Sequence, residues 1–389
     1  MSRYLVSRSE AKSHIKPKLT IQCTSTEHRL QERCRSNSDC SDGLYCFNCQ
    51  FSKPRYFRSS CVRSTVTNPF KLVNDSLPFN KYAFLAAHNS FAIKAGHEEE
   101  KVPTVTLTNQ EDSITQQLNN GVRALMLYTY DYKGDVLLCH SFKGRCHAYA
   151  AFQRAIDAFK EIEAFMSKNP SEIVTLILED YVTSPKGLTR VFKESGLMKF
   201  WFPLSRMPTN VRNWPLVKDM VGKNQRLIVF TSMQSKQKSE GIAYQWNYMV
   251  ENQYGNQGME PGRCPKRNES SPLNDHTKSL VLVNHFKTIP MKLTTCEDNS
   301  RQLIKTLQTC YVTSLLVIDG TCYLAAGHRW ANFVAVDYYK RSAGGGAFEA
   351  VDVLNGELMC GCSYIHACVV GSSSKSRPCR KIPNILTFN

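Results

Sequence analysis

From Phe70 onward, short apolar runs typical of buried strands alternate with amphipathic segments typical of helices. Strands are expected at 82–88, 123–129, 136–141, 173–179, 226–231, 280–286 and 332–338. Helices are expected at 114–119, 149–168, 186–195, 214–222 and 300–309, the second ending at Asn169-Pro170. Alternation over roughly 270 residues favours a (β/α) barrel over an open sheet, and no G-x-G-x-x-G or phosphate loop supports a Rossmann-type alternative. We therefore predict an α/β fold built as a TIM-type barrel.

Polar side chains follow several of these apolar runs at the point where each run ends. They are His88-Asn89, His140, Glu179-Asp180, His285 and Asp337. Because the carboxyl ends of barrel strands gather at one mouth, five such ends indicate a functional site. The two strand-end histidines His88 and His140 suggest a general base and a general acid facing one substrate. A single buried histidine is more often structural, so the pair carries the prediction.

Cysteine is abundant, with 16 in the chain and six in the first 61 residues. These six are Cys23, Cys34, Cys40, Cys46, Cys49 and Cys61. Their clustering indicates a disulfide framework and an oxidising compartment. Zinc is the competing interpretation of Cys46-Phe-Asn-Cys49, but no second C-x-x-C or histidine pair follows at suitable spacing. Near the other end, Cys360, Cys362, Cys368 and Cys379 are expected to pair among themselves or with upstream cysteines.

The charge balance is 49 basic against 33 acidic residues, a net charge of +16. Such an excess favours anionic lipid headgroups, acidic polysaccharide or nucleic acid as partners, or simply gives a basic solvated surface. We expect no nucleic acid, because the basic residues are dispersed and no binding motif is present. No run of 18 apolar residues occurs, so no transmembrane helix is predicted.

The compartment signals disagree. Residues 1–21 lack the apolar core of a signal peptide, whereas the cysteines and the sequons Asn74-Asp-Ser76 and Asn268-Glu-Ser270 agree with secretion. We expect four regions, which are a disordered segment at 1–22, a cysteine-rich module at 23–66, the barrel at 67–370 and a flexible tail at 371–389.

One short duplication interrupts the barrel pattern. Thr-Cys-Tyr occurs at 309–311 and again at 321–323, which is too short a spacing for a structural repeat. The run between the two copies is either a further strand or an insertion. We favour an insertion, which would leave Cys310 or Cys322 without its native partner.

Several segments together resemble the X domain of phosphatidylinositol-specific phospholipase C, and most closely a plant secreted group with a cysteine-rich N-terminal module. They are 77–89 (Leu-Pro-Phe-Asn-Lys-Tyr-Ala-Phe-Leu-Ala-Ala-His-Asn), 117–127, 138–142 (Leu-Cys-His-Ser-Phe), 169–180 and 329–339. This resemblance spans residues 23–370. It implies an irregular TIM barrel, a secreted or cell-surface location, and a monomer that meets phosphoinositide or another anionic phospholipid at a membrane surface.

The resemblance also implies a reaction, in which the inositol 2-hydroxyl attacks phosphorus, forms a cyclic phosphate and releases diacylglycerol. It makes His88 the general base with Asp337 as its carboxylate partner, and His140 the general acid. Arg123 matches an arginine of the family and is a candidate for substrate binding. Tyr244 and Trp246, in the loop 241–249, are candidates for substrate binding that either stack on a sugar or pack internally.

The negative charge that develops on the phosphate in the transition state must be stabilised by a group other than the two histidines. Calcium-dependent members use an Asn after the first histidine and a later Glu, which implies Asn89 and Glu179 as calcium ligands here. Bacterial members place an Arg on the second strand, where this chain has Met126 and Tyr128. These two side chains can supply neither metal ligands nor a cation.

Two functions from different classes therefore follow. The first is a phosphoric diester hydrolase that acts on phosphatidylinositol or a related glycerophospho-substrate. The second is a catalytically weak barrel that binds anionic lipid or polysaccharide at the cell surface. Glycerophosphodiester phosphodiesterase chemistry is a third option, for which the acidic metal ligands are absent.

Overall fold

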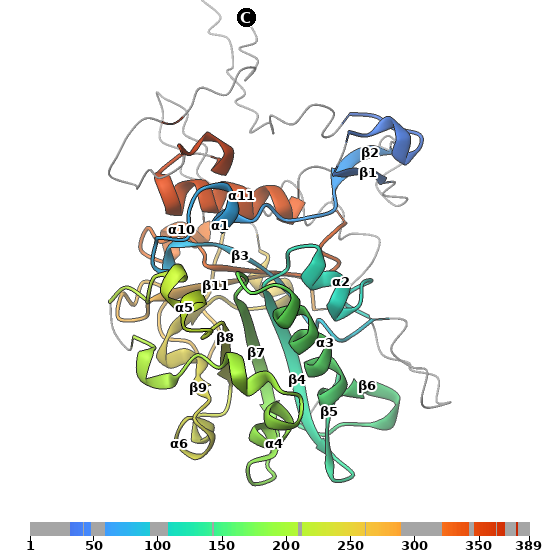
Figure 1. Cartoon of the computed structure of the whole chain (residues 1–389), viewed down its shortest axis with the longest axis vertical. Coiled ribbons are helices and arrows are strands. Elements are labelled where there is room, and N and C mark those ends of the chain that lie inside the picture. Colours follow the sequence, from blue (N-terminus) through green and yellow to red (C-terminus); the bar gives the residue numbers. More distant parts are fainter. Residues whose placement is uncertain are drawn as a thin grey trace, which may run out of the picture.

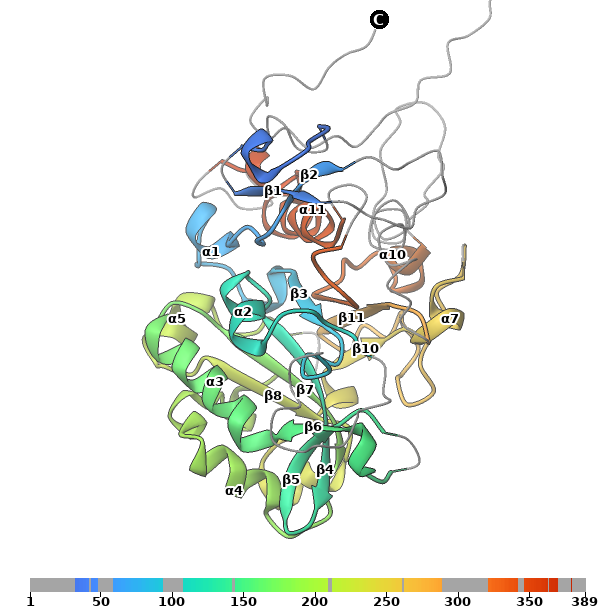
Figure 2. The ribbon, with the colours of Figure 1, turned by 90° about the vertical axis from the view of Figure 1, so that its right-hand side faces the viewer.

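The computed structural model describes residues 32–41, 43–47, 59–93, 108–141, 144–208, 212–260, 262–288, 321–341, 346–362, 364–369 and 379. Eight parallel strands follow one another around a barrel in chain order (Figures 1 and 2). They are β3 (Phe84–Ala87), β4 (Ala124–Tyr132), β7 (Val174–Tyr181), β8 (Leu227–Thr231), β9 (Ala243–Tyr244), β10 (Met249–Glu251), β11 (Leu280–His285) and β12 (Phe333–Val336). The ladder runs from β10 through β12 and β3 to β9. Within the described ranges no ladder joins β9 to β10, so the predicted barrel is confirmed as an irregular one with one open seam.

Both faces of the barrel strands are buried, which explains their near-continuous apolar sequences. In β8, Leu227 and Val229 pack outward against the helix layer, while Ile228 and Phe230 fill the interior. Aromatic side chains close the interior, including Phe84 stacked on Phe333 with ring centroids 5.8 Å apart. The barrel is thus a packed core with chemistry left to its ends.

Helices surround this sheet. They are α1 (Pro69–Leu72), α2 (Ile114–Asn119), α3 (Ala155–Lys168), α4 (Gly187–Glu194), α5 (Val217–Gly222), α6 (Ser235–Glu240), α7 (Gly255–Gly258), α10 (Thr321–Ala325) and α11 (Gly346–Cys360). Single 3-10 turns occupy Asn37–Asp39, Phe79–Lys81, Ala148–Ala150, Leu197–Phe200, Leu204–Arg206, Gln245–Asn247 and Ile365–Ala367. A Ser113/Gln116 capping box starts α2 where predicted. The helix predicted at 300–309 lies outside the described residues.

Two sequence predictions are right only in part around the second strand. The strand expected at 136–141 is β5 (Asp135–Cys139), which forms an antiparallel hairpin with β4 instead of joining the barrel. The hairpin turns at Lys133 and Gly134, both with positive φ, as a tight two-residue turn requires. The helix expected from 149 begins only at Ala155, because the preceding residues form β6 (Ala151–Arg154) and pair with β5.

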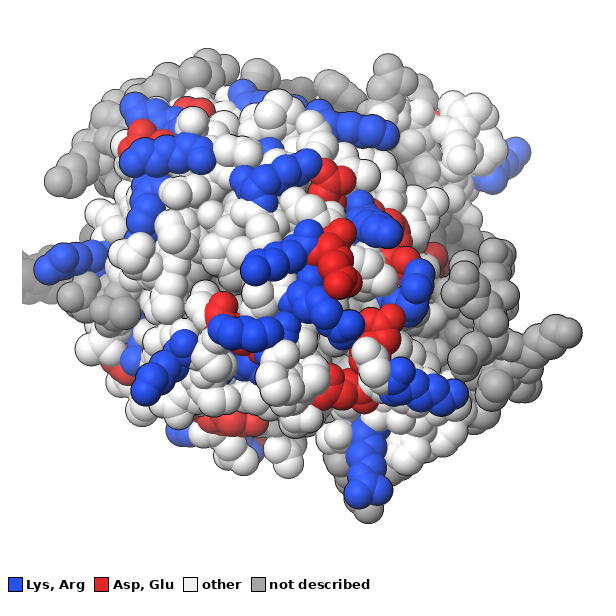
Figure 3. All heavy atoms as spheres, turned by 60° about the horizontal axis from the view of Figure 1, so that its bottom comes forward, with Lys and Arg blue, Asp and Glu red and all other residues white. Residues whose placement is uncertain are grey.

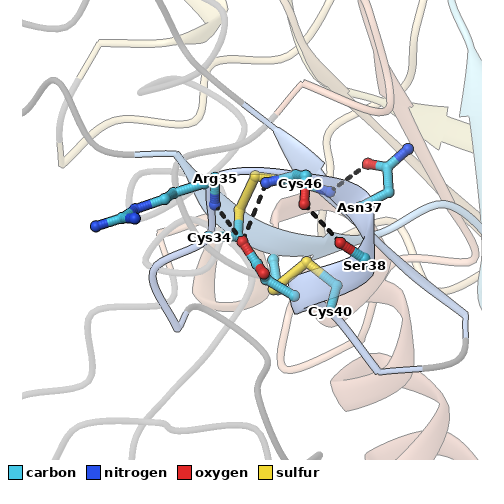
Figure 4. Close-up of a disulfide and its surroundings, with 9 residues drawn as sticks. Cys34, Arg35, Asn37, Ser38, Cys40 and Cys46 are labelled. Atoms are coloured by element: carbon cyan, nitrogen blue, oxygen red, sulfur yellow. Dashed lines mark hydrogen bonds between the residues drawn. A yellow bond between two sulfur atoms is a disulfide. The ribbon is translucent and has the colours of Figure 1, made fainter.

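The cysteine-rich module is a small antiparallel pair, β1 (Leu44–Phe47) and β2 (Ser60–Arg63). Two disulfides, Cys34–Cys46 and Cys40–Cys61, hold it together, which confirms the disulfide interpretation for these four cysteines. Figure 4 shows the Cys34–Cys46 bridge, beside which Asn37 Oδ1 accepts a hydrogen bond from the Cys46 backbone N–H at 2.9 Å. Cys23 and Cys49 fall outside the described ranges.

The end of the barrel where the strands begin is closed by α11, which lies across it in Figure 1. The Asn355 side chain accepts a hydrogen bond from the backbone N–H of Ala83, at the start of β3, at 2.8 Å. Arg63 of β2 forms an ion pair with the fully buried Asp352 of α11, which ties the cysteine-rich module to this closed end.

The C-terminal cysteines pair among themselves, as Cys360–Cys368 and Cys362–Cys379. Cys322 is bonded to Cys264, so it does not lack a partner, whereas Cys310 and the expected insertion lie outside the described residues. Among the residues described, no helix combines the length and the apolar character needed to cross a membrane.

Candidate active site

A pocket open to solvent lies where the barrel strands end. Figure 3 shows this end of the molecule, where Lys and Arg side chains are interspersed with Asp and Glu. The pocket is lined by His88, Asn89, Met126, Leu127, Tyr128, Ile177, Glu179, Gln245, Glu251, Tyr254, Arg267, Asn284 and Phe286. The predicted mouth of the barrel is thus a real cavity with both apolar and ionisable walls.

His88 and Asp337 form the best-defined pair of the pocket. The two residues directly follow β3 and β12, and the parallel register of Val336 with Ala87 puts them side by side. His88 Nδ1 lies 2.8 Å from Asp337 Oδ1, and the imidazole stacks on Phe286 with ring centroids 3.6 Å apart. Both residues are buried. The carboxylate fixes the ring by one nitrogen and leaves Nε2, on the other side, for a substrate.

Amide side chains hold this pair in place. Asn109 Nδ2 donates to Asp337 Oδ1 at 3.0 Å, and Asn89 Nδ2 donates to Asn109 Oδ1 at 3.1 Å. Gln110 Nε2 donates to the backbone carbonyls of His88 and Val336. Asn109 and Gln110 were not predicted, because neither ends an apolar run. Asn89, expected as a metal ligand, uses its amide nitrogen to support the His88–Asp337 pair.

His140 reaches this end of the barrel by a different route from the one predicted. The β4–β5 hairpin projects beyond the barrel and returns, so its antiparallel register brings His140 back beside Tyr128, with ring centroids 6.3 Å apart. The Cys139–Cys146 disulfide closes a short loop that contains His140. The histidine is half-buried and stands next to the pocket wall at Tyr128.

Elsewhere in the pocket lining, one buried arginine forms ion pairs with three carboxylates. Arg267 Nη1 donates to Glu251 at 3.2 Å, Nη2 to Glu179 at 3.0 Å, and Nε to Glu269 at 3.1 Å. Burial alone lowers the pKa of Arg267, but the charges of Glu251 and Glu179 outweigh it and raise the pKa above its usual value. The guanidinium therefore stays charged at any physiological pH.

Arg267 was missed because it sits in a loop after β10, near the equally basic Arg263 and Lys266. Nothing in the local sequence separates a buried arginine from exposed neighbours. Glu251, at the end of β10, was missed because this three-residue strand is too short to show a period.

The two aromatic residues predicted to bind substrate lie behind this cluster. Trp246 is buried, donates from Nε1 to Glu251 at 3.1 Å, and lies under the Arg267 guanidinium. Tyr244 packs edge-on against Trp246 at 5.5 Å. Neither side chain lines the pocket, whereas Gln245 between them does. Of the two options for these aromatic residues, stacking on a sugar or packing internally, internal packing describes where they lie.

Arg123, also predicted to bind substrate, lies at the opposite end of the barrel. It precedes β4 and donates from Nε to Glu172 at 2.9 Å and from Nη1 to the carbonyls of Leu118 and Val122. Burial lowers the pKa of Arg123, while Glu172 opposes that effect. The prediction of substrate contact is wrong, because a residue before a barrel strand faces the closed end.

Two further strand-end residues point away from the pocket. Asp180 accepts hydrogen bonds from Thr231 and from the backbone of Val182, and its pKa is raised by burial. Asn284 of β11 and Phe286, directly after it, line the pocket, so the buried His285 between them belongs to the other face of the strand. Because side chains alternate between the two faces of a strand, Asp180 and His285 do not belong to the residues that line the mouth.

The predicted calcium ligands do not form a vacant oxygen set. The Glu179 carboxylate already accepts from Arg267, and Met126 and Tyr128 bring no carboxylate to the second strand. Burial, followed by the charge of Glu179, raises the pKa of Tyr128, so its phenol stays protonated. This donor set does not fit a calcium ion well. Calcium as a cofactor stays a prediction.

The chain is similar in sequence to known proteins. The PI-PLC X family model matches residues 83–355. A PI-PLC X domain-containing protein of Arabidopsis thaliana is 46% identical over 353 residues, which cover 90% of this chain and 79% of the relative. An uncharacterized secreted protein of Arthroderma benhamiae is 24% identical over 283 residues, covering 70% of this chain and 60% of that protein.

Solved structures of phosphatidylinositol-specific phospholipase C are also similar. The Staphylococcus aureus protein matches with a TM-score of 0.47 at 11% identity, covering 74% of this chain and 95% of that one. The Listeria monocytogenes protein matches with a TM-score of 0.45 at 12% identity, covering 74% and 97%. From the family match and the Arabidopsis relative, the chain belongs to the PI-PLC X domain family.

Proposed function

We propose that this protein is a phosphoric diester hydrolase that cleaves phosphatidylinositol, or a related glycerophospho-substrate, to a cyclic phosphate. The observation that carries the proposal is the buried His88–Asp337 pair at the mouth pocket, with Nδ1 and Oδ1 2.8 Å apart. A carboxylate that fixes one imidazole nitrogen leaves the other as a positioned base. Membership of the PI-PLC X family supports the same reaction class.

In the proposed reaction, His88 Nε2 takes the proton of the inositol 2-hydroxyl, whose oxygen attacks phosphorus. Asp337 keeps the Nδ1 proton in place and stabilises the imidazolium that forms. The bond from phosphorus to the glycerol oxygen then breaks, and His140 donates a proton to that oxygen. Diacylglycerol and a cyclic inositol phosphate leave, and the two histidines have exchanged protonation states.

The pocket walls suit a polyhydroxylated headgroup. Gln245 and Asn284 offer amide groups, and Phe286 and Ile177 offer apolar surface. Tyr254, exposed to 44%, stands at the rim. The excess of basic residues would favour an anionic membrane surface. Six disulfides among the described cysteines, and a relative described as secreted, are compatible with an extracellular location, so we propose lipid in an outward-facing leaflet as the substrate.

The second candidate function is binding of an anionic lipid or polysaccharide with little turnover. It is favoured by Met126 and Tyr128 at the second-strand positions, where the family's charged groups are absent. Binding alone, however, does not require a base that is buried and oriented by a carboxylate. The hydrolase is therefore the proposal that accounts for more of the site.

The test is release of water-soluble inositol phosphate from phosphatidylinositol vesicles. We expect wild-type protein to release it, and His88→Ala to lose activity by roughly 10²- to 10⁴-fold. His276→Ala is the matched control, since His276 is exposed and outside the pocket, and it should keep full activity. Full activity in His88→Ala would overturn the assignment. Vesicle binding without release by wild-type protein would favour the second candidate.

A further inference from the structure

We propose that the Arg267 guanidinium fills the place that a divalent metal would need, and that one of its N–H groups donates to the substrate phosphate. This inference deepens the proposed function and rests on it for the phosphate. The part of the proposal that concerns the metal, that no divalent ion binds where Arg267 lies, rests on geometry alone. The starting point is that one buried guanidinium is the shared partner of Glu179, Glu251 and Glu269.

The three carboxylates approach different edges of the guanidinium plane. Glu251 takes Nη1, Glu269 takes Nε with a second contact to Nη2, and Glu179 takes Nη2. A planar fork of five donors in fixed directions fits such convergence, whereas an ammonium offers only three donors, all on one atom. The set is thus shaped for arginine.

The ligands of Arg267 are themselves fixed. Glu251 is completely buried and accepts from Gln245 at 2.7 Å and from Asn284 at 2.9 Å. The arginine plane is sandwiched between Trp246 and Tyr254, at 5.2 Å and 5.1 Å from the ring centroids. The Cys264–Cys322 disulfide, three residues before Arg267, ties its loop to α10. A cation held this firmly costs no reorganisation when a charge develops beside it.

The guanidinium also has one donor to spare. Of its five N–H groups, Nε and two on Nη2 point to Glu269 and Glu179, and one on Nη1 points to Glu251. Among the contacts of the described residues, no acceptor is assigned to the second N–H of Nη1. Arg267 lines the pocket together with His88, and in this proposal the remaining N–H donates to a phosphate oxygen of a bound substrate.

A metal ion would have to displace this arrangement. Calcium prefers six to eight oxygen ligands, and the carboxylate predicted for it, Glu179, is already ion-paired with Arg267. The second strand contributes a thioether and a phenol, from Met126 and Tyr128. The protein would therefore act without divalent metal, and removing the guanidinium would expose three carboxylates to solvent cations.

The experiment measures cation binding directly, without turnover. Calcium is titrated by calorimetry, and terbium by Tyr- and Trp-sensitised luminescence, into wild-type protein, Arg267→Ser and Arg267→Lys. We expect no saturable wild-type binding at the pocket up to millimolar calcium. Arg267→Ser should bind terbium at least tenfold more tightly than wild type, and the double variant Arg267→Ser/Glu179→Gln should lose that gain. Saturable wild-type calcium binding that Glu179→Gln abolishes would overturn the proposal.

A second readout addresses the phosphate. Binding of inositol 1-phosphate, measured by calorimetry in EDTA, should be at least tenfold weaker in Arg267→Lys than in wild type, and unchanged affinity would contradict the phosphate contact. If Arg267→Ser does not fold, the wild-type calcium titration and Arg267→Lys still decide the proposal. If wild-type protein binds neither calcium nor phosphate and shows no turnover on any lipid, the proposed function fails. The inference that Arg267 fills the place of a divalent metal is then still supported.

Discussion

At the closed end of the barrel, Arg123 donates to Glu172 and to two backbone carbonyls, and Arg226 donates to the carbonyls of Met166, Asn169 and Glu172. At the mouth, Asp337 contacts only one nitrogen of the His88 imidazole. One N–H of Arg267 Nη1 has no acceptor among the described residues. Both ends bury charge. At the closed end that charge is matched by partners from the chain, and at the mouth part of it faces a pocket.

This difference separates stability from chemistry. Charged groups whose partners are all internal lose a partner when mutated, so the cost falls on folding. Groups whose second side faces a cavity can act on a ligand, so the cost falls on function. The following predictions test that separation, from the largest expected effect to the smallest.

Asp337→Asn should lower kcat/KM on phosphatidylinositol by roughly 10²- to 10⁴-fold, because the carboxylate no longer fixes His88 as a base. The side chain keeps its shape, so the melting temperature should change little. Rate measurement and thermal melting on the same preparation check both statements. A variant that melts far lower, but is fully active when folded, would assign Asp337 to stability instead.

Arg123→Ala should lower the free energy of unfolding by about 3–5 kcal/mol, since it leaves the buried Glu172 with only the hydrogen bond from Asn68 and the longer, 3.8 Å ion pair with Lys71. Activity per folded molecule should be unchanged. Arg154→Ala is the control, because Arg154 pairs with Asp157 on the surface and should contribute no more than about 0.5 kcal/mol. Urea unfolding measures both. Loss of activity in folded Arg123→Ala would contradict the separation of the two ends.

The double variant Cys139→Ser/Cys146→Ser should lower kcat, because the bridge holds the return strand that carries His140. Opening such a short loop costs about 2 kcal/mol of stability. The matched control is Cys360→Ser/Cys368→Ser at the closed end, which should lose comparable stability and keep kcat per folded molecule. If both pairs affect kcat equally, the mouth bridge has no special role.

Glu357→Gln tests charge at the closed end by pH. Burial raises the pKa of Glu357 to about 7, so the folded protein holds this proton more tightly than the unfolded chain. Stability from this group is therefore present at low pH and is lost as pH rises from about 4.5 to about 7. Wild type should lose a few degrees of melting temperature relative to the variant over that range, about 1 kcal/mol after solvent screening. A parallel loss in the variant would rule out Glu357 as the cause.

Much of the fold was readable from the sequence because parallel strands buried on both faces are continuously apolar. His88 and Asp337 were found for the related reason that polar residues directly after such runs collect at the mouth. Arg123 should have been excluded by the same logic, since it precedes its strand. The apolar sequence of a strand does not show whether it runs parallel or antiparallel to its neighbour. The antiparallel β5 therefore could not be distinguished from a barrel strand.

The second half of the site could not be read in this way. Arg267 lies in a loop, and its partners come from β7, β10 and the same loop, so only tertiary packing unites them. Asn109 is separated from Asp337 by more than 200 positions. Such contacts depend on loop paths that no local pattern encodes.

The most direct test of the central claim is phosphorus NMR of the product formed from phosphatidylinositol vesicles in EDTA. The proposed internal attack, with His88 as base and no metal, predicts the resonance of a five-membered cyclic inositol phosphate together with diacylglycerol, and its loss in His88→Ala. An acyclic phosphate monoester as the first product, or turnover that stops in EDTA and returns with calcium, would contradict the account.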